Sequence, residues 1–339
     1  MNIKSLLIGS AAALAVVSGA QAADAIVAAE PEPLEYVRVC DAFGTGYFYI
    51  PGTETCLKIG GYVRFEAQFS DVDDFDWNWR TRGLVTFDAK SDSEIGTIGS
   101  VITLRTWAED QDSSDDRVEL DEAYITAGGF KVGYAYNYWD NDLSGETDDI
   151  GSNRLNMIGY EYTADAFAFG IFAEELSQSY SEELTADYAG DDNIGVTAQI
   201  SGAFGPVNAF LLGSYDFAAE NGAIRLLATA DLGPGQLGLA GIYSTGQNAY
   251  YDVSEWTIAA QYAVAVTDKF SITPGFQYWD TLDVDVDGDF TGSRDAWRAG
   301  VTLDYAIAEG LTSKLSVQYT DEDGEDEVVS GFFRLQRSF

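Results

Sequence analysis

Hydrophobic and polar residues alternate along most of the chain, a pattern typical of β-strands whose two faces meet different surroundings. From 57 to 69 the odd positions are apolar or Gly, whereas the even positions include Lys58, Arg64 and Glu66. The alternation recurs from 77 to 89 and from 297 to 307. Strands of soluble sheets are mostly about five or six residues long, whereas a tilted strand needs roughly nine to eleven to cross a bilayer. The pattern therefore predicts membrane-spanning β-strands.

The alternating segments together predict an all-β fold, a transmembrane antiparallel barrel of about sixteen strands, because bacterial barrels have an even strand number. The expected strands are 57–69, 77–90, 95–107, 118–127, 130–138, 153–163, 166–175, 192–202, 205–215, 223–232, 236–247, 252–266, 269–280, 294–308, 311–320 and 328–339. Tight turns such as 127–129 and 233–235 alternate with long acidic connections. This predicts short periplasmic turns and long outer loops. Where the alternation slips, we expect a bulge near Asp121 and Glu122.

The two ends of the chain indicate export. Residues 1–22 combine Lys4, an apolar run and a small-residue site at Ala22, which predicts a cleaved signal peptide. The remainder contains no apolar stretch near the roughly 18 residues of a membrane helix. The last strand ends in Phe339, which resembles the terminal assembly signal of bacterial outer-membrane barrels. We therefore expect a signal peptide (1–22), an N-terminal segment (23–56) and a barrel (57–339) in the bacterial cell outer membrane.

Composition excludes several function classes. The chain contains no His, which removes the commonest general base and zinc ligand, so neither an enzyme, nor a metal site, nor a cofactor is expected. A formal net charge of −38 repels nucleic acid. The carboxylates gather in blocks that are typical of solvated loops. The seven Trp residues fall near strand ends and are expected at the headgroup level, although aromatics also simply favour strands: Trp77, Trp79, Trp107, Trp139, Trp256, Trp279 and Trp297.

Three local patterns have alternative interpretations. The glycine motif at 233–238 has no following helix to receive a phosphate, so dinucleotide binding is not predicted. The segment from Asp283 to Gly288 resembles the start of a calcium loop, but Arg294 occupies the position that needs a bidentate Glu. Weak calcium binding there, bridging to phosphorylated lipopolysaccharide, stays open. Paired carboxylates such as Asp148 and Asp149 are compatible with glycosidase chemistry, but the sequence gives no cleft for it.

Cys40 and Cys56 are the only cysteines of the chain. In an exported protein, pairing is the default interpretation. A closed loop of that size contributes roughly 3 kcal/mol of stability in the chain-entropy model. We therefore expect a disulfide-linked hairpin ahead of the first long strand.

The run from Tyr36 to Arg64, which includes both cysteines, resembles the N-terminal signature of the major outer-membrane porins of Brucella and related rhizobial bacteria. The similarity extends over the mature chain. It implies a homotrimer of water-filled, sixteen-stranded diffusion channels for small hydrophilic solutes. Its other partners would then be outer-membrane lipid and lipopolysaccharide, with divalent cations as candidate bridges.

In that family the third outer loop folds inward to form the pore constriction, and the segment 139–150 resembles this loop in position. Its candidate carboxylates are Asp140, Asp142, Glu146, Asp148 and Asp149. Basic residues on the inward phase of strands that become neighbours on closure are candidates for one opposing wall: Lys58, Arg64, Arg80, Arg82, Arg298 and Arg334. Alternatively, these are scattered lumen charges with local partners.

The expected function is a general diffusion porin, a passive channel with a cation preference, because acidic residues surround the outer mouth. Two alternatives remain at this stage. A substrate-specific sugar channel needs aromatic rings directed inward along a path, and a structural or adhesin barrel needs a plugged lumen.

Overall fold

The computed structural model describes residues 38–72, 76–108, 117–176 and 193–339. The chain divides into Met1–Arg38 and a compact unit, Val39–Phe339, which contains all of the described strands. The expected signal peptide lies outside the described residues, as do residues 23–37. Within the described ranges, no helix is long and apolar enough to span a membrane.

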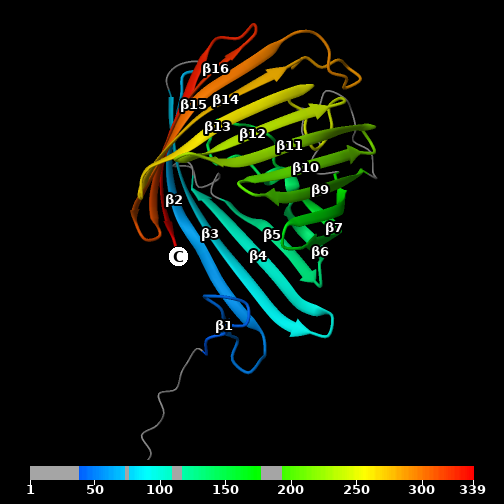
Figure 1. The fold of residues 1–339 in the computed structure, drawn as a ribbon, viewed down its shortest axis with the longest axis vertical. Coiled ribbons are helices and arrows are strands. Elements are labelled where there is room, and N and C mark those ends of the chain that lie inside the picture. The colour runs from blue at the N-terminus through cyan, green and yellow to red at the C-terminus, as the bar shows by residue number, and fades with distance from the viewer. Residues whose placement is uncertain (1–37, 73–75, 109–116, 177–192) are drawn as a thin grey trace, which may run out of the picture. The chain divides into compact units, whose positions relative to one another are not determined.

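Sixteen antiparallel strands pair in chain order and close into a barrel where β17 meets β2 (Figure 1). They are β2 (Cys56–Ser70), β3 (Asp76–Ser93), β4 (Gly96–Ala108), β5 (Arg117–Ala127), β6 (Phe130–Tyr136), β7 (Arg154–Thr163), β8 (Phe167–Glu175), β9 (Ile194–Phe204), β10 (Val207–Asp216), β11 (Asn221–Leu232), β12 (Gly235–Ser244), β13 (Trp256–Thr267), β14 (Phe270–Asp280), β15 (Asp295–Ala308), β16 (Leu311–Glu322) and β17 (Val328–Ser338). The predicted all-β barrel is confirmed.

The strand register explains where the alternation slips. Thr103 of β4 pairs with Glu122 of β5, but the next residue, Leu104, pairs with Leu120. Asp121 is therefore the extra residue of a β-bulge, as predicted. The bulge turns the Asp121 side chain, which is 3% exposed, into contact with Arg105 and Arg154.

The predicted strands 236–247 and 252–266 extend too far toward each other, and local hydrogen bonds explain why. β12 ends at Ser244 and β13 begins at Trp256, so 245–247 and 252–255 belong to a loop instead. The Asn248 side chain accepts hydrogen bonds from the backbone N–H groups of Tyr250 (3.1 Å) and Tyr251 (3.2 Å). This side-chain turn competes with the strand ladder. Not every outer connection is long either, because only residues 217–220 join β10 to β11.

The outward face of the barrel is apolar, with aromatic pairs on it. Trp79 packs edge-on against Phe65, with ring centroids 5.8 Å apart, and Trp297 lies 5.3 Å from Tyr319. Trp77 and Trp79 are 53% and 64% exposed. Such exposure suits rings that lie in the interfacial region of a bilayer.

Three of the seven Trp residues do not belong to this outer belt. Trp107 and Trp279 are 7% and 4% exposed, and each has at least one arginine guanidinium group over its ring. Trp139 is fully buried in the loop after β6. The expectation that all seven lie at the headgroup level was wrong for these three, because they face the inside of the barrel.

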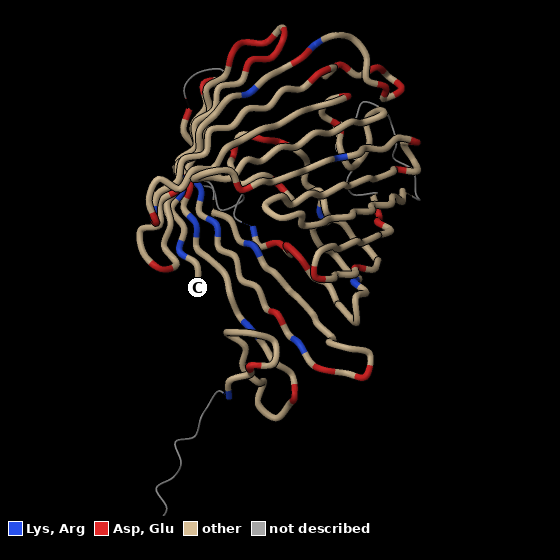
Figure 2. The backbone as a smooth tube through the Cα atoms, in the orientation of Figure 1, with Lys and Arg blue, Asp and Glu red and all other residues tan. Residues whose placement is uncertain are grey.

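The inside of the barrel is divided between an apolar and a charged part. Inward residues of β10 to β13, among them Leu212, Leu227 and Ile242, are nearly inaccessible to solvent. They pack with residues of two loops, 137–153 and 245–255, in one hydrophobic cluster. The opposite wall, formed by β2 to β5 and β17, carries many of the cations (Figure 2). One side of the lumen is therefore filled with apolar side chains, whereas the other is polar.

The N-terminal segment forms the expected disulfide-linked hairpin. Cys40 is bonded to Cys56, and the short strand β1 (Phe48–Tyr49) pairs with the start of β2. The Tyr47 ring is buried against the disulfide, and its hydroxyl donates a hydrogen bond to Asp88 of β3. This hairpin lies at the barrel end that holds the short turns, as does Phe339, which exchanges two backbone hydrogen bonds with Gly61.

Candidate functional site

The candidate site is organised by the loop 137–153, which connects β6 to β7 and lies against the inner wall. It begins with a short 3₁₀ helix, Tyr138–Asp140, whose first turn is capped by Asn137: the side chain accepts a hydrogen bond from Trp139 N at 3.0 Å. From there the loop contacts inward side chains of strands between β10 and β17. The loop therefore lies inside the barrel, and its expected role as the pore constriction stays a prediction.

The base of the loop is held by Arg225 of β11, which is only 1% exposed. Its guanidinium donates hydrogen bonds to the carbonyl oxygens of Tyr138 (2.6 Å), Trp139 (2.8 Å) and Ile150 (3.0 Å). The indole Nε1 of Trp139 donates to Ser214 Oγ at 2.8 Å. Buried carbonyl groups need hydrogen-bond donors, and this one arginine supplies donors to carbonyl groups at both ends of the loop.

The middle of the loop is held by amide side chains of the facing strands. Gly145 N donates to Gln261 Oε1 at 2.7 Å, and Asp149 N donates to Gln277 Oε1 at 2.5 Å. Gln277 returns a hydrogen bond from Nε2 to the Asp149 carbonyl at 2.8 Å. A Cβ atom on Gly275 would lie 2.8 Å from the Thr147 side chain, so only glycine permits this close approach.

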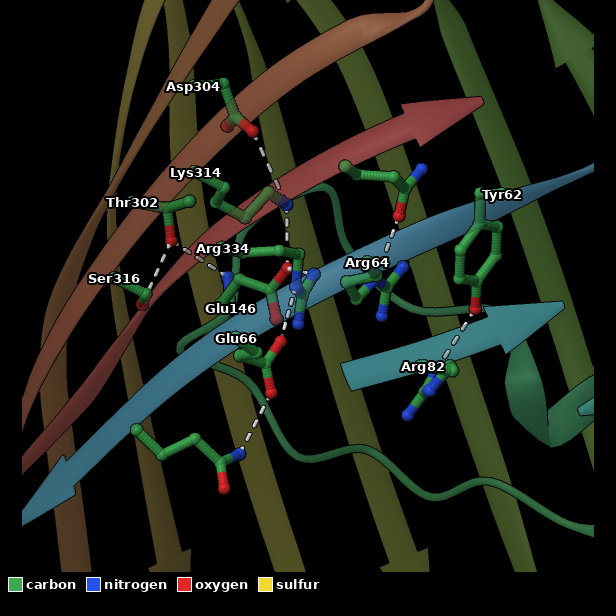
Figure 3. A network of polar contacts seen from close by, with 12 residues as sticks. Tyr62, Arg64, Glu66, Arg82, Glu146, Thr302, Asp304, Lys314, Ser316 and Arg334 are labelled. Atoms are coloured by element: carbon green, nitrogen blue, oxygen red, sulfur yellow. Dashed lines mark hydrogen bonds and ion pairs between the residues drawn. The ribbon is translucent and has the colours of Figure 1, made fainter. Parts of the chain in front are cut away.

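Between Gly145 and Asp149, the side chain of Glu146 enters a network of ion pairs (Figure 3). The Glu146 carboxylate accepts hydrogen bonds from Lys314 Nζ (2.7 Å) and Arg334 (3.2 Å). Arg334 also pairs with Glu66 at 2.6 Å, and Arg80 joins Glu66 at 2.5 Å. Glu66 is 1% exposed, and its two arginine partners supply the charge that a buried carboxylate needs.

The five candidate carboxylates occupy different environments. Glu146 is paired with cations, whereas Asp148 turns back and accepts from Leu143 N at 3.2 Å. Asp140 accepts from Ser152 Oγ at 2.5 Å. Asp142 and Asp149 are exposed and form no ion pair within the part of the chain that the structure describes.

The loop carboxylates have raised pKa values. Although the Asp142 side chain reaches solvent, its partial desolvation, together with the charges of Asp148 and Asp140, raises the pKa of Asp142 to about 7. Desolvation also raises the pKa values of Asp148 and Asp140. Asp142 is therefore partly protonated near neutral pH.

The predicted basic wall forms only in part. Arg64, Arg80, Arg82 and Arg334 come together on β2, β3 and β17, because Arg64 pairs in register with both Arg82 and Gln336. Lys58 lies farther toward the short turns, 5.9 Å from the centroid of the Tyr47 ring. Arg298 lies on β15, where it donates to Thr320 at 3.1 Å and covers the Trp279 ring. The latter two do not join the cluster.

Several residues of the site were not predicted from the sequence. Lys314 shares the polar phase of β16 with Ser316 and Gln318, so the alternation already carried a signal for it. Arg225 is a lone cation within an apolar strand, which is a weaker signal. The cation cluster around Trp107, where the Arg82 guanidinium lies 3.8 Å from the ring centroid, depends on strand pairing and has no local signal.

Comparisons with known proteins agree with this architecture. A family model described as Porin subfamily matches residues 24–333. The outer membrane protein IIIA of Rhizobium leguminosarum bv. viciae is 47% identical over 350 residues, which cover 98% of this chain and 93% of that protein. Porin Omp2a of Brucella melitensis is 34% identical, with complete coverage of both chains.

Solved structures show the same fold at low sequence identity. A loop-deletion mutant of the outer membrane protein OmpT of Vibrio cholerae has a TM-score of 0.60 at 12% identity, covering 85% of this chain and all of that one. OprB of Pseudomonas putida also has a TM-score of 0.60, at 10% identity, covering 84% of this chain and 94% of that one.

We predict that Arg225→Leu releases the loop 137–153 from the wall. The substitution leaves three buried carbonyls without their donor, each at a cost of roughly 1–3 kcal/mol. Thermal unfolding should occur at a lower temperature, and single-channel currents should become noisier.

The matched control is Arg294→Leu, because Arg294 forms ion pairs with Asp283 and Glu322 that remain accessible to solvent. Such pairs contribute about 0–1 kcal/mol. Equal loss of stability in the two variants, with unchanged current noise in Arg225→Leu, would rule out the anchoring role.

Proposed function

Because the chain belongs to the porin family of the bacterial outer membrane, we propose that it is a general diffusion channel with a modest cation preference. Family membership makes the protein a channel rather than an enzyme and places it in the outer membrane, as expected. The finer properties, which are the breadth of solutes and the sign of the selectivity, are inferred from the site.

We propose that the pore constriction lies between the loop 137–153 and the wall formed by β2, β3 and β17. The observation that carries this proposal is the position of Glu146, whose partners Lys314 and Arg334 lie on the inner wall near Arg64 (Figure 3). A sixteen-stranded barrel is too wide for side chains to fill, so the loop decides how much of the lumen remains open. The carboxylates of the loop and the arginines of the wall then face the permeating solute.

The proposed cation preference rests on loop carboxylates that form no ion pair among the described residues. Asp142 and Asp149 are exposed and unpaired within the described part of the chain, and the outer loops carry many further carboxylates. Charges in a wide vestibule are screened over a Debye length of about 8 Å at physiological ionic strength. The two loop carboxylates should therefore dominate, while Arg64 and Arg82 oppose them locally.

A sugar-specific channel is less well supported by the inward aromatic rings. Arg82 covers Trp107 at 3.8 Å, and Arg298 covers Trp279 at 5.1 Å from the ring centroid. A ring face occupied by a guanidinium is not available to stack on a sugar. A structural or adhesin barrel would show no conductance.

The proposed function predicts stable, open single-channel currents in a planar bilayer that contains the purified protein. Under a KCl gradient, the reversal potential should have the sign of modest cation preference, and the preference should weaken at high salt because screening increases. Maltodextrins should not block the current. Absence of conductance would contradict the channel, and anion preference would contradict the assignment of charges.

The raised pKa of Asp142 predicts a pH-dependent selectivity. A carboxyl with a pKa of about 7 is mostly charged at about pH 8 and mostly protonated at about pH 6. The cation preference should therefore increase as the pH rises through this range, measured as the reversal potential in a fixed KCl gradient.

Two variants separate Asp142 from its neighbour. Asp142→Asn should remove this pH step, whereas Asp149→Asn should lower the cation preference and retain the step. If the step persists in Asp142→Asn, another group is responsible for it.

We propose a homotrimer, as the resemblance to porins implies. Near the seam between β17 and β2, the outward residues Val63, Phe87 and Phe333 are 54%, 36% and 43% exposed and offer an apolar surface. Crosslinking in mild detergent should give a heat-sensitive band at three chain masses. Val63→Asn with Phe333→Asn should weaken it, whereas Leu226→Asn on β11 should not. Monomer alone under all extraction conditions would contradict the trimer.

A role for divalent cations at lipopolysaccharide stays a prediction. In the outer loop 281–294, Asp283 pairs with Arg294, and Asp285 accepts hydrogen bonds from Asp287 N and Asp289 N. No group of three or more metal-ligating side chains occurs among the residues that the structure describes.

A further inference from the structure

A cavity of about 170 Å³ lies on the inner wall next to Glu146. It is lined by Arg64, Asp304, Thr312, Lys314, Arg334 and Gln336. Lys314 pairs in register with Arg334, and Thr312 pairs with Gln336, so the cavity extends from the level of Glu146 toward the short turns. Three of the lining side chains are cations, and one is a carboxylate.

Positive charge exceeds negative charge around this cavity. The carboxylates of Glu66, Glu146 and Asp304 are paired with Arg80, Arg334 and Lys314. Arg64 and Arg82 are the additional cations of the network, and within the described residues neither forms an ion pair with a carboxylate. The excess cations are therefore Arg64 at the cavity and Arg82 beside it.

Neutral side chains hold both arginines in place. Gln336 accepts a hydrogen bond from Arg64 Nε at 2.8 Å, and the guanidinium lies 4.7 Å from the centroid of the Tyr62 ring. Arg82 donates to the Tyr62 hydroxyl at 3.3 Å, and its buried Nε has no hydrogen-bond partner in the described part of the chain. These contacts orient the two guanidinium groups without neutralising them.

Two other inward arginines of the barrel differ in this respect, whereas Arg298 and Arg225 also have neutral partners, Thr320 and backbone carbonyl groups. Arg105 and Arg154 share the Asp121 carboxylate. In a chain with a formal net charge of −38, carboxylates for such pairing are abundant. An arginine that is left with amide and phenol partners in the lumen keeps its capacity to bind an anion.

We propose that this cavity binds a small oxyanion, the carboxylate or phosphate group of a permeating solute, with Arg64 as its principal ligand. The planar guanidinium presents two parallel N–H donors to such a group, and Lys314 and Arg334 add positive charge from the other side. The inference rests on the proposed open channel, because the anion must reach the cavity through the lumen.

The neighbouring carboxylates keep this binding weak. Asp304 lies 3.5 Å from Lys314 at the edge of the cavity, and Glu146 shares both Lys314 and Arg334. Weak binding suits a channel, since a solute must leave the site as readily as it enters. The subsite would thus assist the passage of anionic solutes that the acidic outer loops otherwise repel.

Single-channel recording tests the subsite directly. Potassium phosphate or potassium succinate is added to a KCl solution at constant ionic strength and at about pH 8. We expect a saturable decrease of the current, with a half-effect on the order of 10 mM. A decrease with both anions supports a general oxyanion site, and a decrease with only one supports the site and identifies which group it prefers.

Variants assign the effect to Arg64. Arg64→Gln should raise the half-effect concentration about tenfold or more, whereas Arg298→Gln, the loss of an equal charge elsewhere on the inner wall, should leave it unchanged. If Arg64→Gln gives no channels, Arg64→Lys keeps the charge but loses the two parallel donors, and it should weaken the effect severalfold.

Three results would overturn the subsite: no decrease with either anion in an open channel, an equal change in Arg64→Gln and Arg298→Gln, or an undiminished effect in Arg64→Lys. An unmodified protein that conducts no KCl current would instead contradict the channel itself.

Discussion

The hydrogen bonds between Arg225 and the loop 137–153 are the interaction on which the arrangement of the lumen depends. A wide barrel leaves an interior that its own side chains do not fill, and a loop that enters it brings backbone groups that need partners. Arg225 reaches three carbonyl oxygens at both ends of the loop, and it is itself almost inaccessible to solvent. With the ends fixed in this way, the middle of the loop lies along β13 and β14, and Glu146 reaches the cations of β16 and β17.

The division of the interior follows from this anchoring. The loops 137–153 and 245–255 pack over apolar inward residues of β10 to β13, with Trp139 stacked on Tyr251 at a centroid distance of 6.1 Å. That half of the lumen is filled by apolar side chains, so the permeation path that we propose lies in the half that carries Glu66, Arg64 and their neighbours. The apolar packing narrows the remaining space, so the charged side chains of the polar half lie closer to a solute in the proposed path.

Much of the fold was predictable from the sequence, because a strand that separates lipid from water alternates at every second residue. The strands, the short turns, the bulge at Asp121 and the disulfide between Cys40 and Cys56 all follow from local patterns. The inward position of Trp107 and Trp279 does not follow from such patterns. Alternation distinguishes two faces of a strand but does not show which face a ring at the strand end occupies. Four members of the proposed basic wall meet because their strands are neighbours on closure.

What the sequence could not supply was the path of the inward loops. In β10 and β11 both faces carry Leu, because the inward Leu side chains pack against a loop. The sequence alone therefore does not distinguish the inward face from the outward one. Lys58 and Arg298 have the predicted inward phase, but Lys58 lies nearer the short turns and Arg298 lies on β15. Neither joins the arginine cluster of β2, β3 and β17. Their position depends on barrel register and on the loop, both of which involve contacts between residues distant in the chain.

The central claim, that the loop 137–153 rests against the inner wall of the open channel, is tested most directly by an engineered crosslink. Glu146→Cys with Lys314→Cys replaces an ion pair between the loop and the wall, 2.7 Å from Nζ to carboxylate oxygen, by two thiols that a short bifunctional thiol reagent can bridge. We expect this link to form in outer membranes and the linked channel to conduct nearly as the unlinked double variant does. Failure of the two thiols to link, or a large fall in conductance once they do, would contradict it.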